Sequence, residues 1–203
     1  MKTRLNREMK NLHGELKRAD DLMDKEQWAQ ARDILRRGRA AARKGGLPYG
    51  LIAWRLCICL DNLGEVEDAF RAAVEAIDQD PLAHLFRHSF TVVAHRLRDI
   101  VAAAEIGDPA VPRQYALLVE NDAAEDDTHV AMARHLVRAG EAVQAVRLLD
   151  AVTTLSPNFA EAWRLRAEVA RVLGNEDDAA RCEFEAIATE NAVDAAVQMI
   201  ACQ

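Results

Sequence analysis

The chain has 203 residues, of which half are apolar but only 5% aromatic, and its formal net charge is −7. This composition excludes a disordered or collagenous chain and favours alanine-rich helices over a sheet, in which β-branched and aromatic residues would dominate. We expect neither a signal peptide nor a transmembrane helix, because no apolar run has the length of either.

The charges are unevenly distributed along the chain. Residues 1–48 contain 13 basic and 7 acidic side chains, a net charge of +6. The remaining 155 residues contain 13 basic and 26 acidic side chains, a net charge of −13, and no lysine follows Lys44. This asymmetry has two interpretations. Either the basic end binds an anionic surface or the acidic end of a second copy of the chain, or the composition drifts along the chain without a function.

The first predicted helix pair spans residues 12–47. Ala19 in its first helix and Ala31 and Leu35 in its second have the helical spacing of a buried face. The second helix, ARDILRRGRAAARK, is basic and ends before Pro48. Its arginines lack interleaved aromatic residues, so a solvated outer face is favoured over contact with nucleic acid or an anionic membrane.

Residues 50–83 are the clearest helix–turn–helix unit. The first helix has an apolar face spaced i, i+3, i+4, i+7, formed by Ala53, Leu56, Cys57 and Leu60. Gly64 ends that helix, and Pro81 stops the second one. The second helix has small residues on one face, Ala69, Ala73 and Ala76. Two such helices cannot cover their apolar faces alone, so they must stack on neighbours.

Residues 84–125 depart from this pattern. The first predicted helix is too long for a standard repeat, and its apolar side contains Phe86, Phe90, Val93, Leu97, Ile100 and Ala104. A turn, a short helix from about Arg113 and an acidic loop follow it. We interpret this segment as one enlarged, degenerate repeat.

The last part of the chain repeats the unit in register, over residues 126–159 and 160–193. Gly140 and Gly174 are 34 residues apart, and each is followed five residues later by an alanine, Ala145 or Ala179. Residues 194–203 are expected to form a capping helix. Because this segment has few polar residues, it either folds back on the last repeat or forms a homodimer contact.

These residues resemble the tetratricopeptide repeat family, whose small residues let neighbouring helices approach closely. The resemblance implies an all-α, right-handed superhelix of antiparallel helix pairs, a single domain over residues 1–203 with a distorted middle repeat. Two departures are Arg166 and Glu183, which stand where the family has apolar residues, and we expect Leu165 and Phe184 to take over that packing. The alanine-rich and arginine-rich composition indicates a bacterial source of high genomic GC content.

The resemblance also implies a concave groove lined by the first helix of each repeat. The groove residues that we expect to contact a partner are Trp54, Ile58, Asn62, Arg134, Arg138, Arg164 and Arg171. Arginine suits bidentate recognition of carboxylates, so an acidic peptide or segment of another protein is the expected guest. The alternative is that these arginines pair with acidic residues inside the groove, namely Asp127, Glu161 and Glu168.

No motif of the sequence indicates catalysis. His84, His88 and His95 share a helical sector, but they are spread along the axis and lie opposite the apolar stripe, so a solvated face is favoured over a metal site. The four cysteines, Cys57, Cys59, Cys182 and Cys202, lack zinc-ribbon spacing and fit a reducing, cytoplasmic setting. No phosphate-binding loop or nucleophile elbow occurs, and we expect no enzyme activity, metal or cofactor.

The sequence therefore predicts a cytoplasmic, non-enzymatic module that binds a segment of a partner protein. One alternative is a secretion-type chaperone of the same family, which would be dimeric and would hold one exported or assembling client. Another is a regulatory domain whose basic N-terminal part contacts nucleic acid or membrane, with binding that falls steeply as salt rises.

Overall fold

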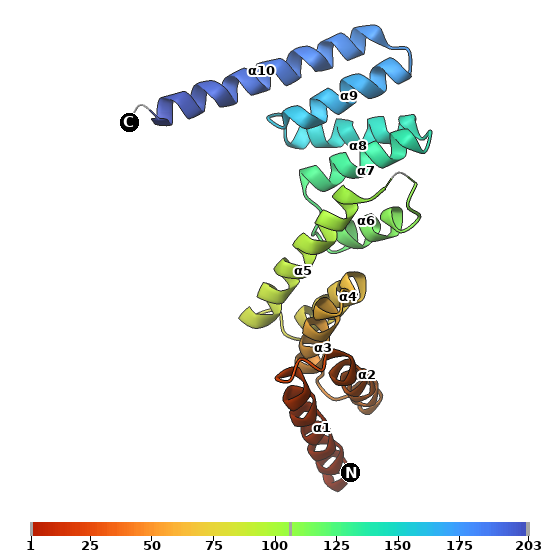
Figure 1. Ribbon diagram of the computed structural model, residues 1–203, viewed down its shortest axis with the longest axis vertical. Helices are drawn as coiled ribbons and strands as arrows, with labels where there is room; N and C mark the ends of the chain where they lie inside the picture. The colour runs from red at the N-terminus through yellow and green to blue at the C-terminus, as the bar shows by residue number, and fades with distance from the viewer. Residues whose placement is uncertain (1, 106, 202–203) are drawn as a thin grey trace. The chain divides into compact units, whose positions relative to one another are not determined.

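The computed structural model describes the backbone of residues 2–105 and 107–201, and the side chains of residues 10–105 and 107–194. The described residues form ten α-helices and no strand, so the prediction of an all-α fold is confirmed (Figure 1). The chain divides into two compact units, Met1–Leu97 and Arg98–Gln203, here called the N-terminal unit and the C-terminal unit. A single repeat domain over the whole chain stays a prediction.

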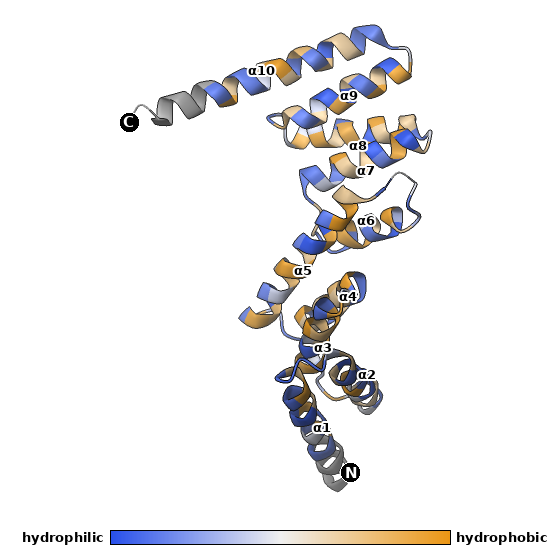
Figure 2. Ribbon diagram, in the orientation of Figure 1, coloured by the Kyte–Doolittle hydropathy of each residue, from blue (hydrophilic) through white to orange (hydrophobic). Residues whose placement is uncertain are grey.

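The N-terminal unit consists of two helix hairpins and the beginning of a fifth helix. Its helices are α1 (Lys2–Met23), α2 (Trp28–Gly45), α3 (Gly50–Asn62), α4 (Val66–Gln79) and the first part of α5 (His84–Ala103). Helix α1 packs against α2, α2 against α3, and α3 against α4. Helices α1 and α2 are largely hydrophilic, whereas hydrophobic residues recur along α3 and α4 (Figure 2). Helix α1 begins ten residues before the repeat predicted from residue 12.

Small residues form much of the interior of this unit, as the repeat pattern predicts. Ala53, Ala69 and Ala76 are fully buried, and Leu56 and Leu60 fill the space beside them. Because an alanine side chain ends at Cβ, two helices that meet at alanines approach closely and pack at high density.

The two hairpin turns of the N-terminal unit have the same hydrogen bond but different residues. In the second hairpin the Glu65 N–H donates to the Leu60 carbonyl at 2.9 Å, and Gly64 has φ 74°. In the first hairpin the Gln27 N–H donates to the Leu22 carbonyl at 2.9 Å, but Glu26 occupies the left-handed position with φ 57°. A residue with a Cβ is strained there, since the left-handed region costs about 1–2 kcal/mol outside glycine.

We expect Glu26→Gly to raise the free energy of unfolding of the N-terminal unit by about 0.5–1 kcal/mol, because relief of strain exceeds the added chain entropy. Urea unfolding followed by circular dichroism measures the change. The matched control is Gly64→Ala, which introduces the same strain into the second turn and should destabilise. An unchanged unfolding midpoint for Glu26→Gly would contradict this account.

The C-terminal unit contains the end of α5 and five further helices, α6 (Val111–Glu120), α7 (Asp126–Arg138), α8 (Ala142–Leu155), α9 (Ala160–Val172) and α10 (Glu176–Ala201). Consecutive helices from α6 to α10 pack together, and α7 also contacts α9. A core cluster joins α7, α8 and α9 through residues that include Val130, Ala145, Leu149 and Val169. Gly140 and Gly174 have φ 83° and 75°, which confirms their predicted role as helix ends.

The enlarged middle segment forms the two helices that its sequence predicts, the long α5 and the short α6. Phe86, Val93 and Leu97 on α5 are buried as expected, whereas Ile100 is 39% exposed. The Arg98 guanidinium donates to the Ala123 carbonyl at 3.1 Å and pairs with Glu125 at 2.6 Å, so the end of α5 is tied to the acidic loop before α7.

A tyrosine and a histidine connect α6 to α7 in the C-terminal unit. The Tyr115 hydroxyl lies 2.7 Å from Nδ1 of His129, and their rings meet edge to face. Burial lowers the pKa of His129, while the nearby Asp126 and Asp127 raise it in part. The imidazole is therefore held neutral at physiological pH, with one ring nitrogen engaged by the phenol.

The expected replacement of Arg166 and Glu183 in the core by their neighbours is only half correct. Leu165 is buried, but Phe184 is 69% exposed. Arg166 itself is only 8% exposed. Its guanidinium reaches Asp150 on α8 at 2.7 Å and Asp178 on α10 at 2.6 Å, so an ionic bridge fills a position where the repeat pattern has an apolar side chain.

The predicted capping helix over residues 194–203 is wrong as a separate element. Helix α10 continues from Glu176 to Ala201 without interruption, and residues 202 and 203 lie outside the described part of the chain. Asn191 stands where the preceding repeats have a helix-ending proline. Because the following residues are rich in alanine and contain neither glycine nor proline, the helix has no reason to end there.

Candidate functional site

A pocket of about 140 Å³ lies between α3 and α5 in the N-terminal unit. Both helices line it: α3 with Cys57, Ile58 and Asp61, and α5 with His88, Ser89, Val92 and Val93. Cys57 and Val93 are buried and form an apolar base, whereas Val92 is 40% exposed at the rim. The helical spacing of the four lining residues on α5 brings them to one side of that helix.

Two polar contacts join α3 to α5 beside this pocket. The indole Nε1 of Trp54 donates to the Ser89 hydroxyl at 3.0 Å, and the same ring lies 6.1 Å from that of Phe86. The Arg96 guanidinium donates to the Asp61 carboxylate at 2.5 Å. These contacts hold the two helices at a set distance, so the pocket between them is preorganised.

The structure places the three predicted contact residues of α3 in different situations. Ile58 lines the pocket and is half-buried, and Trp54 is half-buried with its indole engaged by Ser89. Asn62 is exposed, but its side-chain amide donates to the Ile58 carbonyl of its own helix at 2.9 Å. Ile58 is therefore the residue of this set best placed to touch a guest.

The predicted arginines belong to the C-terminal unit, and three of them have carboxylate partners. Arg134 on α7 donates to Glu161 on α9 at 2.5 Å. Arg164 and Arg171 on α9 pair with Glu190 and Glu183 on α10. The alternative interpretation, in which the arginines pair inside the groove, named Asp127, Glu161 and Glu168 as partners. Of these three, Glu161 is found here. The pairs with α10 were not foreseen, because the sequence alone does not show which turns of α9 and α10 face each other.

The seven predicted contact residues are divided between the two units. Three lie on α3 of the N-terminal unit, and four lie on α7 and α9 of the C-terminal unit, among them the exposed Arg138. The prediction that they serve one guest stays a prediction.

Sequence reasoning missed the part of the pocket that α5 provides. His88, Ser89 and Val92 follow one another at helical spacing, but His88 was assigned to a solvated face. It is indeed exposed, as are His84 and His95, and it stands at the rim. The signal that could have identified these residues is the long α5, whose beginning continues the repeat pattern and must therefore stack on α3.

The buried cysteines of the described residues are not suited to nucleophilic chemistry. Cys57, Cys59 and Cys182 are free and buried. Burial raises the pKa of Cys57 to about 12 and that of Cys59 to about 11, so both remain thiols at neutral pH. Thiols are neither nucleophiles nor metal ligands in that form.

Two other kinds of feature are absent from the described residues. They contain no group of three or more His, Cys, Asp or Glu side chains placed to hold a metal ion. No helix among them is both long enough and apolar enough to cross a membrane.

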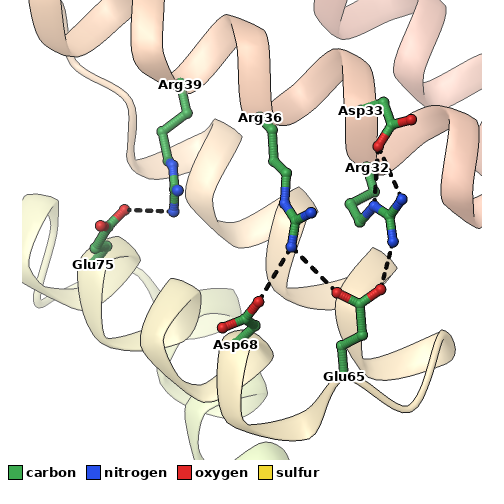
Figure 3. A network of polar contacts seen from close by, with 7 residues as sticks. All are labelled: Arg32, Asp33, Arg36, Arg39, Glu65, Asp68 and Glu75. Atoms are coloured by element: carbon green, nitrogen blue, oxygen red, sulfur yellow. Dashed lines mark hydrogen bonds and ion pairs between the residues drawn. The ribbon is translucent and has the colours of Figure 1, made fainter.

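The basic helix α2 is engaged in an ionic network with α4 (Figure 3). Arg32 and Arg36 both reach the Glu65 carboxylate, at 2.5 and 3.2 Å, and Arg36 also reaches Asp68 at 3.2 Å. Arg39 and Arg43 share Glu75. The positive charge of this helix face is thus partly neutralised by carboxylates of the same chain. This weakens the interpretation of α2 as a nucleic-acid or membrane contact.

Comparison with known proteins finds likeness in structure but not in sequence. No protein-family profile and no curated protein matches this chain. A crystal structure of MamA is similar at 12% identity and a TM-score of 0.45, covering 87% of this chain and 96% of that one. The TPR2AB-domain:pHSP90 complex of yeast Sti1 is similar at 13% identity and 0.42, covering 90% and 79%.

A third solved structure is that of YrrB, a TPR protein with an unusual peptide-binding site. It is similar at 12% identity and a TM-score of 0.42, covering 87% of this chain and 85% of its own. At these identities and scores the likeness carries nothing about a shared ligand.

Proposed function

We propose that this chain, whose helix hairpins have the tetratricopeptide-repeat fold, is a non-enzymatic interaction module that holds one apolar side chain of a partner segment in the α3–α5 pocket. The observation that carries the proposal is the preorganised pocket of about 140 Å³ with an apolar base. Its volume suits one side chain, since a cavity of about 150 Å³ lined by apolar residues accommodates benzene.

The chemistry of the rim indicates how the rest of the segment is held. Asp61 and Arg96 form an ion pair at one side, and Arg96 is the more exposed partner, with 49% of its side chain accessible against 18% for Asp61. His88 offers a ring nitrogen at the rim. An extended or helical segment with polar groups beside its apolar anchor would find hydrogen-bonding partners here without a conformational change, which lowers the cost of binding.

An apolar anchor is favoured over an acidic guest. An acidic segment that bound the C-terminal unit would have to displace Glu161, Glu183 or Glu190 from their arginines. The α3–α5 pocket requires no such exchange. The buried free thiols suit a reducing compartment, so we place this activity in the cytoplasm.

The test is selection of a phage-displayed random-peptide library on the full chain, followed by calorimetry with an enriched peptide. Val92→Trp fills the pocket from its rim and should weaken that peptide at least about tenfold, which is about 1.4 kcal/mol. The matched control is Leu155→Trp, at an 83% exposed position of α8, which should bind like wild type.

Three outcomes would contradict the proposal. If Val92→Trp binds like wild type, the pocket is not the site. If binding is lost instead in the Arg134→Ala, Arg138→Ala double variant, the arginine-bearing surface of the C-terminal unit is the site. If the library yields no enriched sequence, the chain does not recognise short segments.

A further inference from the structure

Helices α3 and α5 run side by side in the same direction, in one fixed register. Two contacts define this register: the Trp54 indole donates to Ser89, and the Arg96 guanidinium donates to Asp61. Each contact joins residues that are 35 apart in the chain. The same offset places the apolar residues that line the α3–α5 pocket between the two contacts. The pocket therefore has an apolar middle and a polar group at each end.

Asp61 forms the end of the pocket that lies towards the C-terminus of α3. It follows Cys57 by one turn, which is about 6 Å along the helix axis. Its Oδ1 accepts from the Arg96 guanidinium, and its Oδ2 accepts no hydrogen bond from the residues that the structure describes. Only 18% of the Asp61 side chain is exposed. The pocket thus presents an acceptor oxygen, largely shielded from solvent, beside an apolar surface.

The ion pair at this end favours a neutral donor over a cation. Arg96 already supplies the opposite charge for Asp61, and a lysine or arginine of a partner that entered the pocket would be repelled by that guanidinium. A hydroxyl group carries no charge, and an O–H that donates to a carboxylate forms a short and strong hydrogen bond. The expected donor at Oδ2 is therefore a hydroxyl.

The volume of the pocket decides which hydroxyl-bearing side chain fits. Serine and threonine would leave most of the 140 Å³ empty. A six-membered ring fills such a space, since an apolar cavity of about 150 Å³ accommodates benzene. Tyrosine has this ring with a hydroxyl at its far end. A ring that packs on Cys57 and Val93, the buried residues of the apolar middle, places its hydroxyl about one helical turn away, beside Asp61.

We propose that the side chain held in the α3–α5 pocket is a tyrosine of the partner segment, whose ring packs on the apolar middle and whose hydroxyl donates to Oδ2 of Asp61. This inference rests on the proposed function and names the partner residue. Asp61 is then the residue that distinguishes tyrosine from phenylalanine. Phenylalanine is disfavoured because its ring would shield the carboxylate from water without giving it a hydrogen bond.

The test compares N-acetyl-tyrosinamide with N-acetyl-phenylalaninamide, which differ by one hydroxyl group, in NMR titrations of the isotope-labelled full chain. Both compounds should shift the amide signals of α3 and α5, and the tyrosine compound should bind about tenfold more tightly. Asp61→Asn keeps the shape of the side chain but removes its charge, so the preference should fall to about twofold or less. The matched control, Arg96→Gln, breaks the same ion pair but keeps the carboxylate, and it should retain the preference.

The outcomes separate this inference from the proposed function. If wild type binds the phenylalanine compound as tightly as the tyrosine compound, and Val92→Trp blocks both, the pocket is the site but does not select tyrosine. If Val92→Trp leaves both affinities unchanged, the pocket is not the site and both proposals are wrong. Loss of the preference in Arg96→Gln as well as in Asp61→Asn would show that the ion pair, and not the carboxylate, makes the distinction. If neither compound shifts the signals of α3 and α5, the pocket does not hold an aromatic ring and the inference is wrong.

Discussion

Phe70→Ala is expected to lower the free energy of unfolding of the N-terminal unit by about 3–5 kcal/mol. Phe70 is fully buried on α4, and its ring lies 5.3 Å from that of Phe90 on α5. Its removal takes away a large, fully buried side chain and leaves a cavity, because alanine neighbours such as Ala69 and Ala73 cannot move in to fill it.

The measurement is urea unfolding followed by tryptophan emission in a Trp163→Phe background, so that only Trp28 and Trp54 of the N-terminal unit report. The matched control is Leu85→Ala, which deletes an apolar side chain that is 56% exposed in the same unit and should change stability little. A loss no larger for Phe70→Ala than for Leu85→Ala would show that α4 and α5 are not packed as described.

Arg166→Ala is expected to lower the free energy of unfolding of the C-terminal unit by about 2–3 kcal/mol. The substitution leaves Asp178, whose side chain is only 14% exposed, without the guanidinium that bridges it to Asp150. Removal of one member of a buried ionic group is costly because its partner remains desolvated. Arg166→Lys should restore little of this stability, since an ammonium group cannot bridge two carboxylates as a planar guanidinium does.

The control is Arg164→Ala, two residues away on the same helix, where the side chain is 62% exposed and paired with Glu190. Exposed pairs contribute little, so we expect a change below about 0.5 kcal/mol. Trp163, which lies beside both positions, reports the unfolding by its emission. Equal effects of the two variants would mean that the bridge adds nothing beyond a surface pair.

The ion pairs of Asp178 also predict that the stability of the C-terminal unit depends on pH. Hydrogen bonds from Arg181 and then the charge of Arg166 lower the pKa of Asp178 below its ordinary value. The stabilisation by this carboxylate is therefore complete above the ordinary pKa of Asp and is lost as the pH falls through the lowered folded-state pKa. Asp178→Asn should be less stable than wild type at neutral pH, and the difference should shrink in acid.

The glycines and alanines that mark each repeat were predictable from the sequence, because their roles depend on local chemistry. Gly64, Gly140 and Gly174 adopt the left-handed conformation that favours glycine, and the alanines five residues later are buried. The apolar spacing of α3 and α7 identified their buried sides, since one face of a helix is a property of the sequence itself. Ile58 was expected as a contact residue from the resemblance to the tetratricopeptide repeat family, and it lines the α3–α5 pocket.

The remaining features depend on which helices meet, and a local pattern does not contain that information. The partners of Arg166, Arg171 and Arg164 come from α8 and α10, and the α3–α5 pocket exists only because two helices 35 residues apart stack at a set distance. Phe184 illustrates the same limit, because its sequence position suits a core residue while its helix is packed on the opposite side. The sequence by itself determined where helices begin, where they end and which face they bury. Only the tertiary structure decided which carboxylate neutralises which arginine and which apolar residues remain exposed, because both depend on the pairing of segments that are distant in the chain.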